Sequence, residues 1–389
     1  MGLQYDVVVI GGGITGASVA AHLSSSRSVL LIEMEGQLGY HSTGRSAALF
    51  ILSYGNSDVR ALTRASRDFF YQPPTAFCES ALVKPRSVLV IAGHEGEAEL
   101  DELLTNLVAG DKFERKTVEE AVALCPILKP DALSGAALSD LLADIEVHEL
   151  QQGYIRTLRR NGGVILSNAQ VVGLQRSGDA WRIETTKDEV TAQVVVNAAG
   201  AWAGEIAHLA GAQDVGLTPL RRTVCLFEPP AGSDFENWPM LSDASDQFYL
   251  KPDAGMLLLS PSDETPSVPT DAQAEELDVA IAIDRIQQVT TLAVRRVTHK
   301  WAGLRSFVKG RSPVIGFDAV QPGFFWQAAF GGFGIQTAPA AASLAASLIL
   351  DRPLDDALAE ANVDLGAVSP RRFVVGEPDD SLWPKLASS

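Results

Sequence analysis

The sequence contains little cysteine and little histidine for its length. Its 389 residues include 3 cysteines and 6 histidines, and no histidine spacing or Cys-x-x-Cys pair is typical of a metal site. Cys78, Cys125 and Cys225 are far apart in the chain. This pattern excludes a disulfide framework and fits a reducing compartment. We therefore predict that the protein holds no metal.

The chain also lacks a long hydrophobic run and an excess of positive charge. Its most apolar late segment, Ala338 to Leu350, is too short to span a bilayer, and we expect no secretory signal at the N-terminus. The formal net charge of −17 argues against nonspecific binding of nucleic acid and against docking on an anionic membrane. We expect a cytoplasmic protein without integral membrane association.

The chain opens with a nucleotide-binding pattern. An apolar run, Val7 to Ile10, enters a glycine cluster in which Gly11, Gly13 and Gly16 have Gly-x-Gly-x-x-Gly spacing. These glycines permit a tight turn, close approach of a pyrophosphate and close packing of the following helix. Glu33 ends the next apolar run, where an acid binds ribose hydroxyls and repels a phosphate. The pattern favours FAD or NAD over NADP.

Further helices and strands follow this opening. The hydrophobic periodicity predicts helices over residues 60–71, 97–108, 118–124, 147–160, 272–289 and an alanine-rich helix ending at Leu350. It predicts strands over residues 87–92, 163–166, 170–175, 181–185, 194–196, 221–227, 248–251, 256–259 and 300–307.

The length and the 46% content of hydrophobic residues favour two domains with a large core. Nucleotide-type segments recur early, in the middle and late in the chain, with sheet-forming segments between them. We therefore predict an α/β fold in which a Rossmann-like dinucleotide-binding domain carries an inserted antiparallel-sheet α+β substrate domain. The predicted dinucleotide-binding domain comprises residues 1–80, 147–215 and 310–389, and the substrate-binding domain comprises residues 81–146 and 216–309.

Several motifs, spread over nearly the whole chain, occur in the same order as in a known family of proteins. They are the opening turn with Glu33, His41-Ser42-Thr43-Gly44-Arg45-Ser46-Ala47, Asn197-Ala198-Ala199-Gly200-Ala201-Trp202, Tyr249 to Met256, Trp301 to Phe307, and Gly331 to Gln336. Together they resemble the D-amino-acid oxidase superfamily, which contains glycine and sarcosine oxidases and D-amino-acid dehydrogenases. The likeness is greatest to the bacterial FAD-dependent D-arginine dehydrogenases.

The resemblance implies that FAD, rather than NAD, is the cofactor, and that the dinucleotide-binding domain is a Rossmann-like FAD-binding domain of the GR2 type. No cysteine lies in these segments, so we expect the FAD to be held non-covalently. The implied cofactor contacts are Gly11, Gly13, Ile14, Thr15, Gly16, Glu33, Met34, His41, Ser42, Thr43, Gly44, Arg45, Ser46, Ala47, Ala48, Val171, Ala199, Gly200, Trp202, Gly303, Gly331, Gly332, Phe333, Gly334, Ile335 and Gln336. His41 is interpreted as a loop residue that hydrogen-bonds to the cofactor rather than as a base.

Two arginines in apolar, strand-like runs are candidate ligands for a carboxylate. Arg305 lies within the run Trp301 to Val308, where a charge must be paired or serve a ligand. Arg221 and Arg222 are adjacent on a strand, so one of the two points inward. The resemblance implies that Arg222 and Arg305 bind the substrate carboxylate and that Tyr249 assists them.

The resemblance also implies how the rest of the substrate is held. The Tyr54 hydroxyl and the Gly332 carbonyl hold the amine, which is neutral when a hydride passes from the α-carbon to the flavin. Leu49, Val88, Gly332 and Gln336 complete the implied substrate pocket. Leu49 and Val88 stand where D-arginine dehydrogenases carry a histidine and a glutamate. A guanidinium without an acid is costly to bury, so we expect apolar or aromatic D-amino acids to be preferred over D-arginine.

The leading hypothesis is an FAD-dependent D-amino-acid dehydrogenase that yields a 2-oxo acid and ammonia. Its partners are a D-amino acid and an electron acceptor, which is a quinone, a dye-like acceptor or oxygen. The alternatives are an oxidase of glycine, sarcosine or another small amine, an FAD-binding interaction module without turnover, and an NAD-dependent dehydrogenase. Two segments are candidate lids over the substrate, Leu49–Asn56 and Ser242–Asp246.

Overall fold

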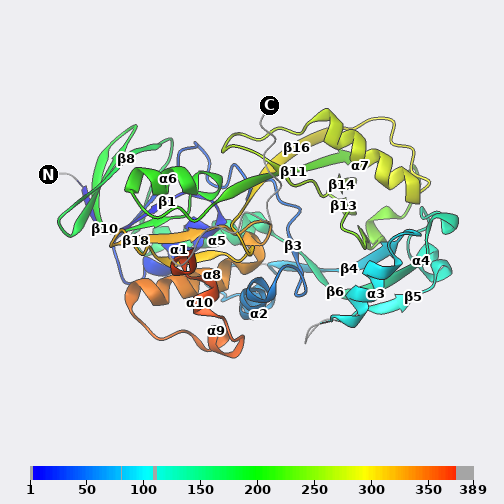
Figure 1. Ribbon diagram of the computed structural model, residues 1–389, viewed down its shortest axis with the longest axis horizontal. Helices are drawn as coiled ribbons and strands as arrows, with labels where there is room; N and C mark the ends of the chain where they lie inside the picture. The colour runs from blue at the N-terminus through cyan, green and yellow to red at the C-terminus, as the bar shows by residue number, and fades with distance from the viewer. Residues whose placement is uncertain (1–2, 80, 108–111, 374–389) are drawn as a thin grey trace.

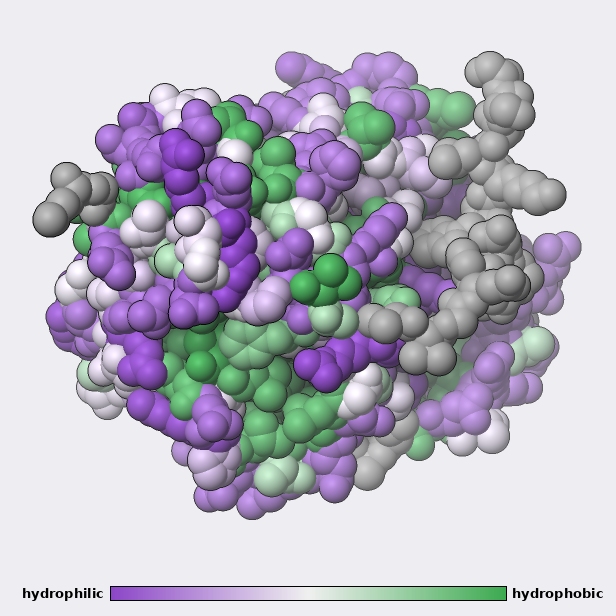
Figure 2. All heavy atoms as spheres, turned by 60° about the vertical axis from the view of Figure 1, so that its left-hand side comes forward, coloured by the Kyte–Doolittle hydropathy of each residue, from purple (hydrophilic) through white to green (hydrophobic). Residues whose placement is uncertain are grey.

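The computed structural model describes residues 3–79, 81–107 and 112–373. Two large β-sheets organise these residues and lie toward opposite ends of the molecule's longest axis (Figure 1). Figure 2 shows one face, where hydrophilic residues cover most of the surface and hydrophobic ones gather in a patch in its lower half. In the described part of the chain, no helix is long and apolar enough to cross a membrane.

The first sheet is mainly parallel and has the strand order β17-β18-β10-β1-β2-β7. Strand β2 and the second half of β1 are buried runs of valine, isoleucine and leucine, as expected for a sheet covered on both faces. The antiparallel pair β8 and β9 extends it beside β10. Its strands are β1 (Leu3–Ile10), β2 (Val29–Ile32), β7 (Val164–Leu166), β8 (Val171–Ser177), β9 (Ala180–Thr185), β10 (Glu189–Asn197), β17 (Val314–Phe317) and β18 (Phe324–Ala328).

Helices rich in small residues cover this sheet. The helices α1 (Ile14–Leu23) and α8 (Gly334–Leu350) pack on each other, and α5 (Val147–Arg160) packs on α1. Alanines on α1 and α8 join Val7 and Val9 of β1 in one apolar core. The small side chains let these helices approach closely, which brings both of their N-termini to one edge of the sheet. The remaining helices near it are α2 (Ser57–Tyr71), α6 (Ala203–Ala210), α9 (Asp356–Glu360) and α10 (Leu365–Val368).

The second sheet is mostly antiparallel and has the strand order β15-β11-β14-β13-β12-β4-β6-β3. Strand β16 pairs with β11, and β5 pairs with β6. Its strands are β3 (Leu49–Phe50), β4 (Val83–Ala92), β5 (Glu114–Lys116), β6 (Gly135–Ile145), β11 (Thr218–Phe227), β12 (Met240–Asp243), β13 (Tyr249–Asp253), β14 (Met256–Ser260), β15 (Thr265–Pro266) and β16 (His299–Phe307). The helices α3 (Glu97–Thr105), α4 (Val118–Leu124) and α7 (Glu276–Val289) accompany it.

The two sheets correspond closely to the predicted division of the chain. Every strand of the first sheet lies within residues 1–80, 147–215 or 310–389. Among the described residues of these three segments, only β3 pairs in the second sheet, where it lies beside β6. This arrangement supports the domain boundaries that we propose, in which β3 leads the chain from one sheet toward the other.

Several elements differ from the sequence-based expectations. Strand β6 was not predicted, and neither were β17 and β18. The helix expected from residue 272 begins at Glu276, because the preceding backbone is extended and the Ala272 carbonyl accepts a hydrogen bond from Arg45. The helix expected over 97–108 ends at Thr105, and residue 108 lies outside the described residues.

Candidate active site

A cavity of about 680 Å³ lies at the carboxyl ends of the parallel strands. This is the edge at which ligands bind in open α/β sheets. Its lining includes most of the residues expected to bind a cofactor. They are Gly11, Gly13, Ile14, Thr15, Glu33, Met34, His41, Ser42, Thr43, Arg45, Ser46, Ala47, Val171, Ala199, Gly200, Trp202, Gly303, Gly331, Gly332, Gly334 and Ile335.

The turn between β1 and α1 has glycines where neighbouring backbone atoms leave no room for a side chain. Gly11 has φ of +106°, and a Cβ on it would lie 2.4 Å from the Ala198 carbonyl oxygen. A Cβ on Gly16 would lie 1.8 Å from the Gly11 carbonyl oxygen. The Ile14 amide at the start of α1 donates to Thr43 Oγ1 across 3.0 Å. The turn therefore presents bare backbone and a helix N-terminus to the cavity, which suits a pyrophosphate.

Glu33 lies at the end of β2, beside this turn. Its carboxylate accepts hydrogen bonds from the Gly12 amide at 2.7 Å and from the Glu35 amide at 2.9 Å. Burial raises the pKa of the Glu33 carboxyl, although both amide donors counteract the rise. A buried acid that still faces the cavity is suited to accept hydrogen bonds from ribose hydroxyls.

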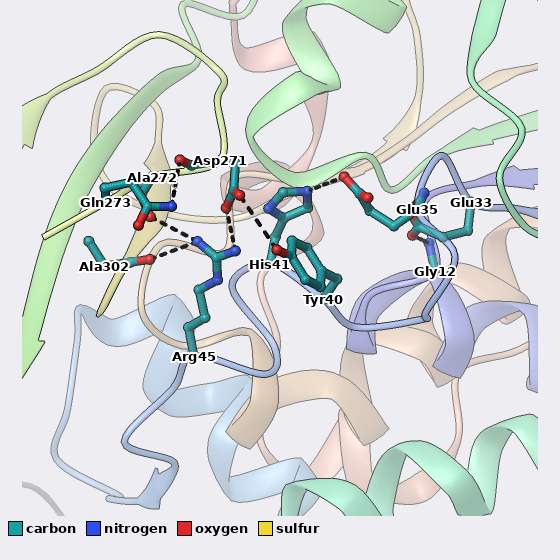
Figure 3. A network of polar contacts seen from close by, with 10 residues as sticks. All are labelled: Gly12, Glu33, Glu35, Tyr40, His41, Arg45, Asp271, Ala272, Gln273 and Ala302. Atoms are coloured by element: carbon teal, nitrogen blue, oxygen red, sulfur yellow. Dashed lines mark hydrogen bonds and ion pairs between the residues drawn. The ribbon is translucent and has the colours of Figure 1, made fainter. Parts of the chain in front are cut away.

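Most residues of the loop 39–46 line the first cavity, and Arg45 of this loop contacts Asp271, Ala272 and Ala302 (Figure 3). Arg45 pairs with Asp271 and donates to the Ala302 carbonyl at 3.0 Å. Ser42 Oγ donates to the Leu304 carbonyl at 2.6 Å. His41 Nε2 lies 3.0 Å from a Glu35 carboxylate oxygen, and its expected contact with the cofactor stays a prediction. These contacts fasten the loop over the cavity at several points.

A second cavity of about 370 Å³ adjoins the first. Arg222, Tyr249, Arg305 and Gly332 line both cavities, so they lie where the two meet. The second cavity alone is lined by the other residues expected to contact substrate, which are Leu49, Tyr54, Val88 and Gln336, and by Ala48.

Arg305 lies on β16 at the junction of the cavities. Its Nη1 donates to the Tyr54 hydroxyl across 3.1 Å. Within the described residues no carboxylate pairs with Arg305. Burial lowers the pKa of its guanidinium, the phenols of Tyr54 and Tyr249 raise it, and the net effect is a rise. The guanidinium therefore stays charged and leaves donors directed at the cavities.

Arg221 and Arg222 point in opposite directions from β11, as the strand geometry predicts. Arg221 pairs with Glu275 and Asp278. Arg222 is 6% exposed and faces the cavities. Its Nε donates to the Asp263 carbonyl at 2.8 Å, and its Nη2 lies 3.3 Å from a Glu264 carboxylate oxygen. Pairing of β11 with β16 sets Arg222 opposite Gly303, two residues before Arg305.

The turn before α8 is close to Arg305. A Cβ on Gly332 would lie 2.9 Å from Arg305 Cζ, and a Cβ on Gly331 would lie 2.1 Å from Phe307 Cε1. The Gln336 side chain accepts from the Ile51 amide at 3.2 Å and donates to Thr63 Oγ1 at 3.0 Å. Gln336 therefore positions the segment after β3 rather than presenting a free amide to the cavity.

Carboxylates belong to the lining of the second cavity, which corrects the expectation of a pocket without an acid. Asp243 and Asp246 both contribute to the lining. Asp243 accepts from the amides of Ser245 at 3.0 Å and Gln247 at 3.2 Å, and burial raises its pKa. Sequence reasoning considered only the positions of Leu49 and Val88, and the turn after β12 was weighed solely as a candidate lid.

Three of the residues expected to bind a cofactor line neither cavity. They are Gly16, Gly44 and Phe333. Gly16 permits the close packing of α1 described above. The Gly44 amide donates to the Gly39 carbonyl, and Phe333 packs against Tyr54 at 4.9 Å between ring centroids. Both support residues that do line the site.

Two polar side chains of the first cavity were missed by the sequence reasoning. Gln327 on β18 and Ser306 on β16 line it, and their side-chain polar atoms find no hydrogen-bond partner among the described residues. A glutamine within the otherwise apolar run Phe324–Ala328 was the feature of the sequence that could have indicated Gln327. The glycine turn and the Glu33 carboxylate, which line this cavity, fit a site built for a polar ligand such as FAD.

Comparison with known proteins places these features in a family. Residues 6–348 match the family model described as DAO, FAD dependent oxidoreductase. Glycine oxidase of Bacillus subtilis is 24% identical over 378 residues, covering 90% of this chain and 95% of that protein.

Solved structures share the fold. The glycine oxidase of Geobacillus kaustophilus superimposes with a TM-score of 0.78 at 19% identity, covering 90% of this chain and 96% of the other. The L-proline dehydrogenase of P. horikoshii gives a TM-score of 0.79 at 20% identity, covering 96% and 99%. The match to the family model spans most of the chain, which belongs to the FAD-dependent oxidoreductases of the DAO family, with FAD as its cofactor.

Proposed function

We propose that this FAD-dependent oxidoreductase oxidises the α-carbon of D-amino acids and releases a 2-oxo acid and ammonia. The observation that carries the proposal is the placement of two arginines at the junction of the two cavities. Arg222 and Arg305 come from paired strands and face the same space. Two guanidinium groups beside a cofactor cavity form a suitable site for a substrate carboxylate.

The surrounding residues supply the other contacts that an amino acid needs. Tyr54 bonds to Arg305, and Tyr249 lines both cavities. We assign the amine to the Tyr54 hydroxyl and the Gly332 carbonyl, and the carboxylate to the arginine pair with help from Tyr249. These contacts would hold the α-carbon at the junction, facing the first cavity.

Bound FAD supplies the acceptor for the hydride that leaves the α-carbon. The protein's residues orient the substrate and exclude water from it. The amine must be neutral for the C–H bond to break. The positive charge of the arginine pair beside the amine favours its neutral form. Water then hydrolyses the imine product to the 2-oxo acid and ammonia.

The second cavity supports a substrate with a sizeable side chain. Its 370 Å³ greatly exceed the space that the hydrogen of glycine requires. Its lining contains many apolar side chains, among them Val88, Leu142 and Met240. Of its two carboxylates, Asp243 accepts from two amides of its own turn, and Asp246 accepts from the Ser262 hydroxyl at 3.2 Å. We therefore propose that apolar or aromatic D-amino acids are preferred, with broad specificity because each methylene contributes only about 1–3 kcal/mol.

An anaerobic titration of the flavoprotein with a panel of amino acids tests the proposal. D-Leu, D-Phe, D-Arg, glycine, sarcosine and the corresponding L-amino acids are added, and the visible flavin absorbance is followed. We expect D-Leu and D-Phe to bleach the flavin faster than D-Arg or glycine does. A flavin that stays oxidised with every compound would contradict the proposal, and so would a clear preference for D-Arg or for L-amino acids.

Oxidation of glycine or a small secondary amine is the second candidate, favoured by the similarity to glycine oxidases. Bleaching by glycine or sarcosine in preference to the larger amino acids would establish it. Formation of hydrogen peroxide in air then distinguishes an oxidase from a dehydrogenase, because a dehydrogenase passes its electrons to an acceptor other than oxygen.

A further inference from the structure

The second cavity is bounded on one side by alternate residues of two neighbouring strands. Val88 and Val90 of β4 line it, and so do Met240 and Ser242 of β12. The two strands pair in parallel, with Met240 beside Val88 and Ser242 beside Val90. Successive side chains of a strand point to opposite faces of the sheet. These four side chains therefore form one continuous wall on the face that meets the cavity.

The residues between them belong to the other face of the sheet. Leu89 and Leu241 pack in an apolar core that includes Ile286 of α7, and neither lines the second cavity. On both strands the alternation thus agrees with the lining of the cavity. It directs the Ser242 side chain toward the cavity and away from α7.

Ser242 is the one polar side chain of this wall. The residue is half-buried, and its hydroxyl makes no hydrogen bond within the described residues. Mostly apolar pockets gain their specificity from a few placed polar groups. A hydroxyl without a partner in an apolar wall is therefore suited to bind a polar atom of the substrate.

The carboxylates near Ser242 are placed differently. Asp243 contributes to the lining, yet it is in register with Ile91, which packs in the core on the α7 side. It thus lies on the opposite side of β12 from Ser242. Asp246 is exposed and accepts from the Ser262 hydroxyl. A cationic substrate group at the wall would meet a hydroxyl rather than a carboxylate, so a neutral polar group fits better.

The distance across the sheet favours a long substrate side chain. Arg222 is on β11 and Ser242 is on β12, and the strand order between them is β11-β14-β13-β12. Three strand spacings correspond to roughly 14 Å, part of which the arginine side chain itself covers. With the substrate carboxylate at the arginine pair, the hydroxyl of D-serine or D-threonine stays close to the α-carbon. The phenol of D-tyrosine reaches much further toward Ser242.

We propose, building on the proposed oxidation of D-amino acids, that Ser242 is a specificity-determining residue whose hydroxyl binds the phenol of D-tyrosine. The ring packs on Val88, Val90 and Met240, whose thioether makes favourable contacts with aromatic edges. The phenol and the serine hydroxyl can each donate or accept a hydrogen bond, so the contact requires no change of protonation. D-tyrosine is thereby preferred over D-phenylalanine, whose ring fits the same wall.

The ratio of kcat/KM for D-tyrosine to kcat/KM for D-phenylalanine tests the proposal. We expect a ratio of about threefold to tenfold in the wild type, equivalent to one neutral hydrogen bond. Ser242→Ala should make the two substrates equal within about twofold, with D-phenylalanine oxidised as in the wild type. Ser242→Thr keeps the hydroxyl and should keep the ratio. Ser87→Ala is the matched control, because Ser87 lies on β4 outside the lining and bonds to Asp140 at 2.7 Å.

Binding of two acids without an amine separates the role of Ser242 from the proposed reaction. Hydrocinnamate and para-hydroxyhydrocinnamate have the skeletons of phenylalanine and tyrosine, and their dissociation constants from the FAD-loaded protein are read from the change in flavin absorbance. The hydroxylated acid should bind about threefold to tenfold more tightly to the wild type and equally to Ser242→Ala. A flavin that stays oxidised with every D-amino acid would contradict the proposed reaction alone, and the two acids would still decide the role of Ser242.

Three results would overturn the assignment. They are equal dissociation constants of the two acids for the wild type, a preference for the hydroxylated acid that persists in Ser242→Ala, and an equal loss of affinity for both acids in that variant. Ser53 also lines the cavity, from the segment between β3 and α2. A preference that is lost in Ser53→Ala and kept in Ser242→Ala would assign the phenol to Ser53 instead.

Discussion

Arg305 Nη1 donates to the Tyr54 hydroxyl across 3.1 Å, linking β16 to the segment between β3 and α2. Tyr54 belongs to the lining of the second cavity. Tyr54→Phe removes this bond and the proposed amine contact. We expect kcat/KM for the best D-amino acid to fall about tenfold, the equivalent of one hydrogen bond. Steady-state kinetics measure this, with Tyr71→Phe at an exposed ring of α2 as the control. Equal kinetics for Tyr54→Phe and wild type would remove Tyr54 from the site.

Glu264 partly neutralises the second arginine of the pair. Its carboxylate lies 3.3 Å from Arg222 Nη2 and 2.6 Å from Arg311 Nη2. A substrate carboxylate at Arg222 must bind close to this negative charge. Glu264→Gln should therefore lower KM by about threefold to tenfold, with little change in kcat.

The measurement for Glu264 is KM at several salt concentrations, because a charge effect weakens as salt is added. Glu276→Gln is the matched control, since Glu276 pairs with Lys300 on the exposed surface of α7. A higher KM for Glu264→Gln would show that Glu264 aids binding by positioning Arg222.

The absence of a side chain at Gly332 leaves room for Arg305. A Cβ would lie 2.9 Å from Cζ and 3.0 Å from Nη1 of Arg305. Gly332→Ala should displace the guanidinium and lower kcat/KM about 100-fold, the scale expected for a misplaced binding group. Flavin content and melting temperature should stay near those of wild type. Gly93→Ala is the control, because its nearest neighbour would lie at 3.8 Å. Full activity of Gly332→Ala would argue against a rigid Arg305.

Glu33 makes the free energy of unfolding of the FAD-free protein depend on pH. Burial raises the pKa of its carboxyl above the ordinary value of 4.5. The folded state then holds this proton more tightly than the unfolded state does. The protonated Glu33 carboxyl stabilises the folded state fully below the ordinary pKa. This contribution is lost as pH rises through the raised pKa of the folded state, and between the two pKa values the free energy of unfolding falls by about 1.4 kcal/mol for each pH unit.

Glu33→Gln removes this titration. Urea unfolding of the FAD-free proteins should show the variant gaining stability relative to wild type as pH rises above the ordinary value. Glu97→Gln, in the exposed first turn of α3, serves as the control. A difference in free energy of unfolding that does not change with pH would contradict this account. FAD affinity of Glu33→Gln should fall about tenfold, since one hydrogen-bonded carboxylate is lost.

Local patterns explain what could be read from the sequence. The turn at Gly11 and the acid at Glu33 were predictable because strand, turn, helix and strand follow each other directly. Strand β6 was not, because GAALSDLLADI contains a single β-branched residue and forms a strand through pairing with β4 and β3.

Contacts between distant segments were beyond such patterns. The meeting of Arg222 with Arg305 was expected only through a family resemblance, and it depends on the register of β11 against β16. The neighbours of Arg222 come from the loop after β14, where the sequence carries no periodic signal. Asp243 reaches the second cavity through the parallel pairing of β12 with β4. Such positions follow from tertiary structure alone.

The reductive half-reaction of Arg305→Met tests the central claim most directly. Methionine fills similar space without charge, so the fold should persist and FAD should still bind. The rate of anaerobic flavin bleaching by D-Leu at low concentration should fall at least about 100-fold, corresponding to two lost charge-assisted hydrogen bonds. A rate within about twofold of wild type, from folded and FAD-loaded protein, would contradict the assignment of the substrate carboxylate to Arg305.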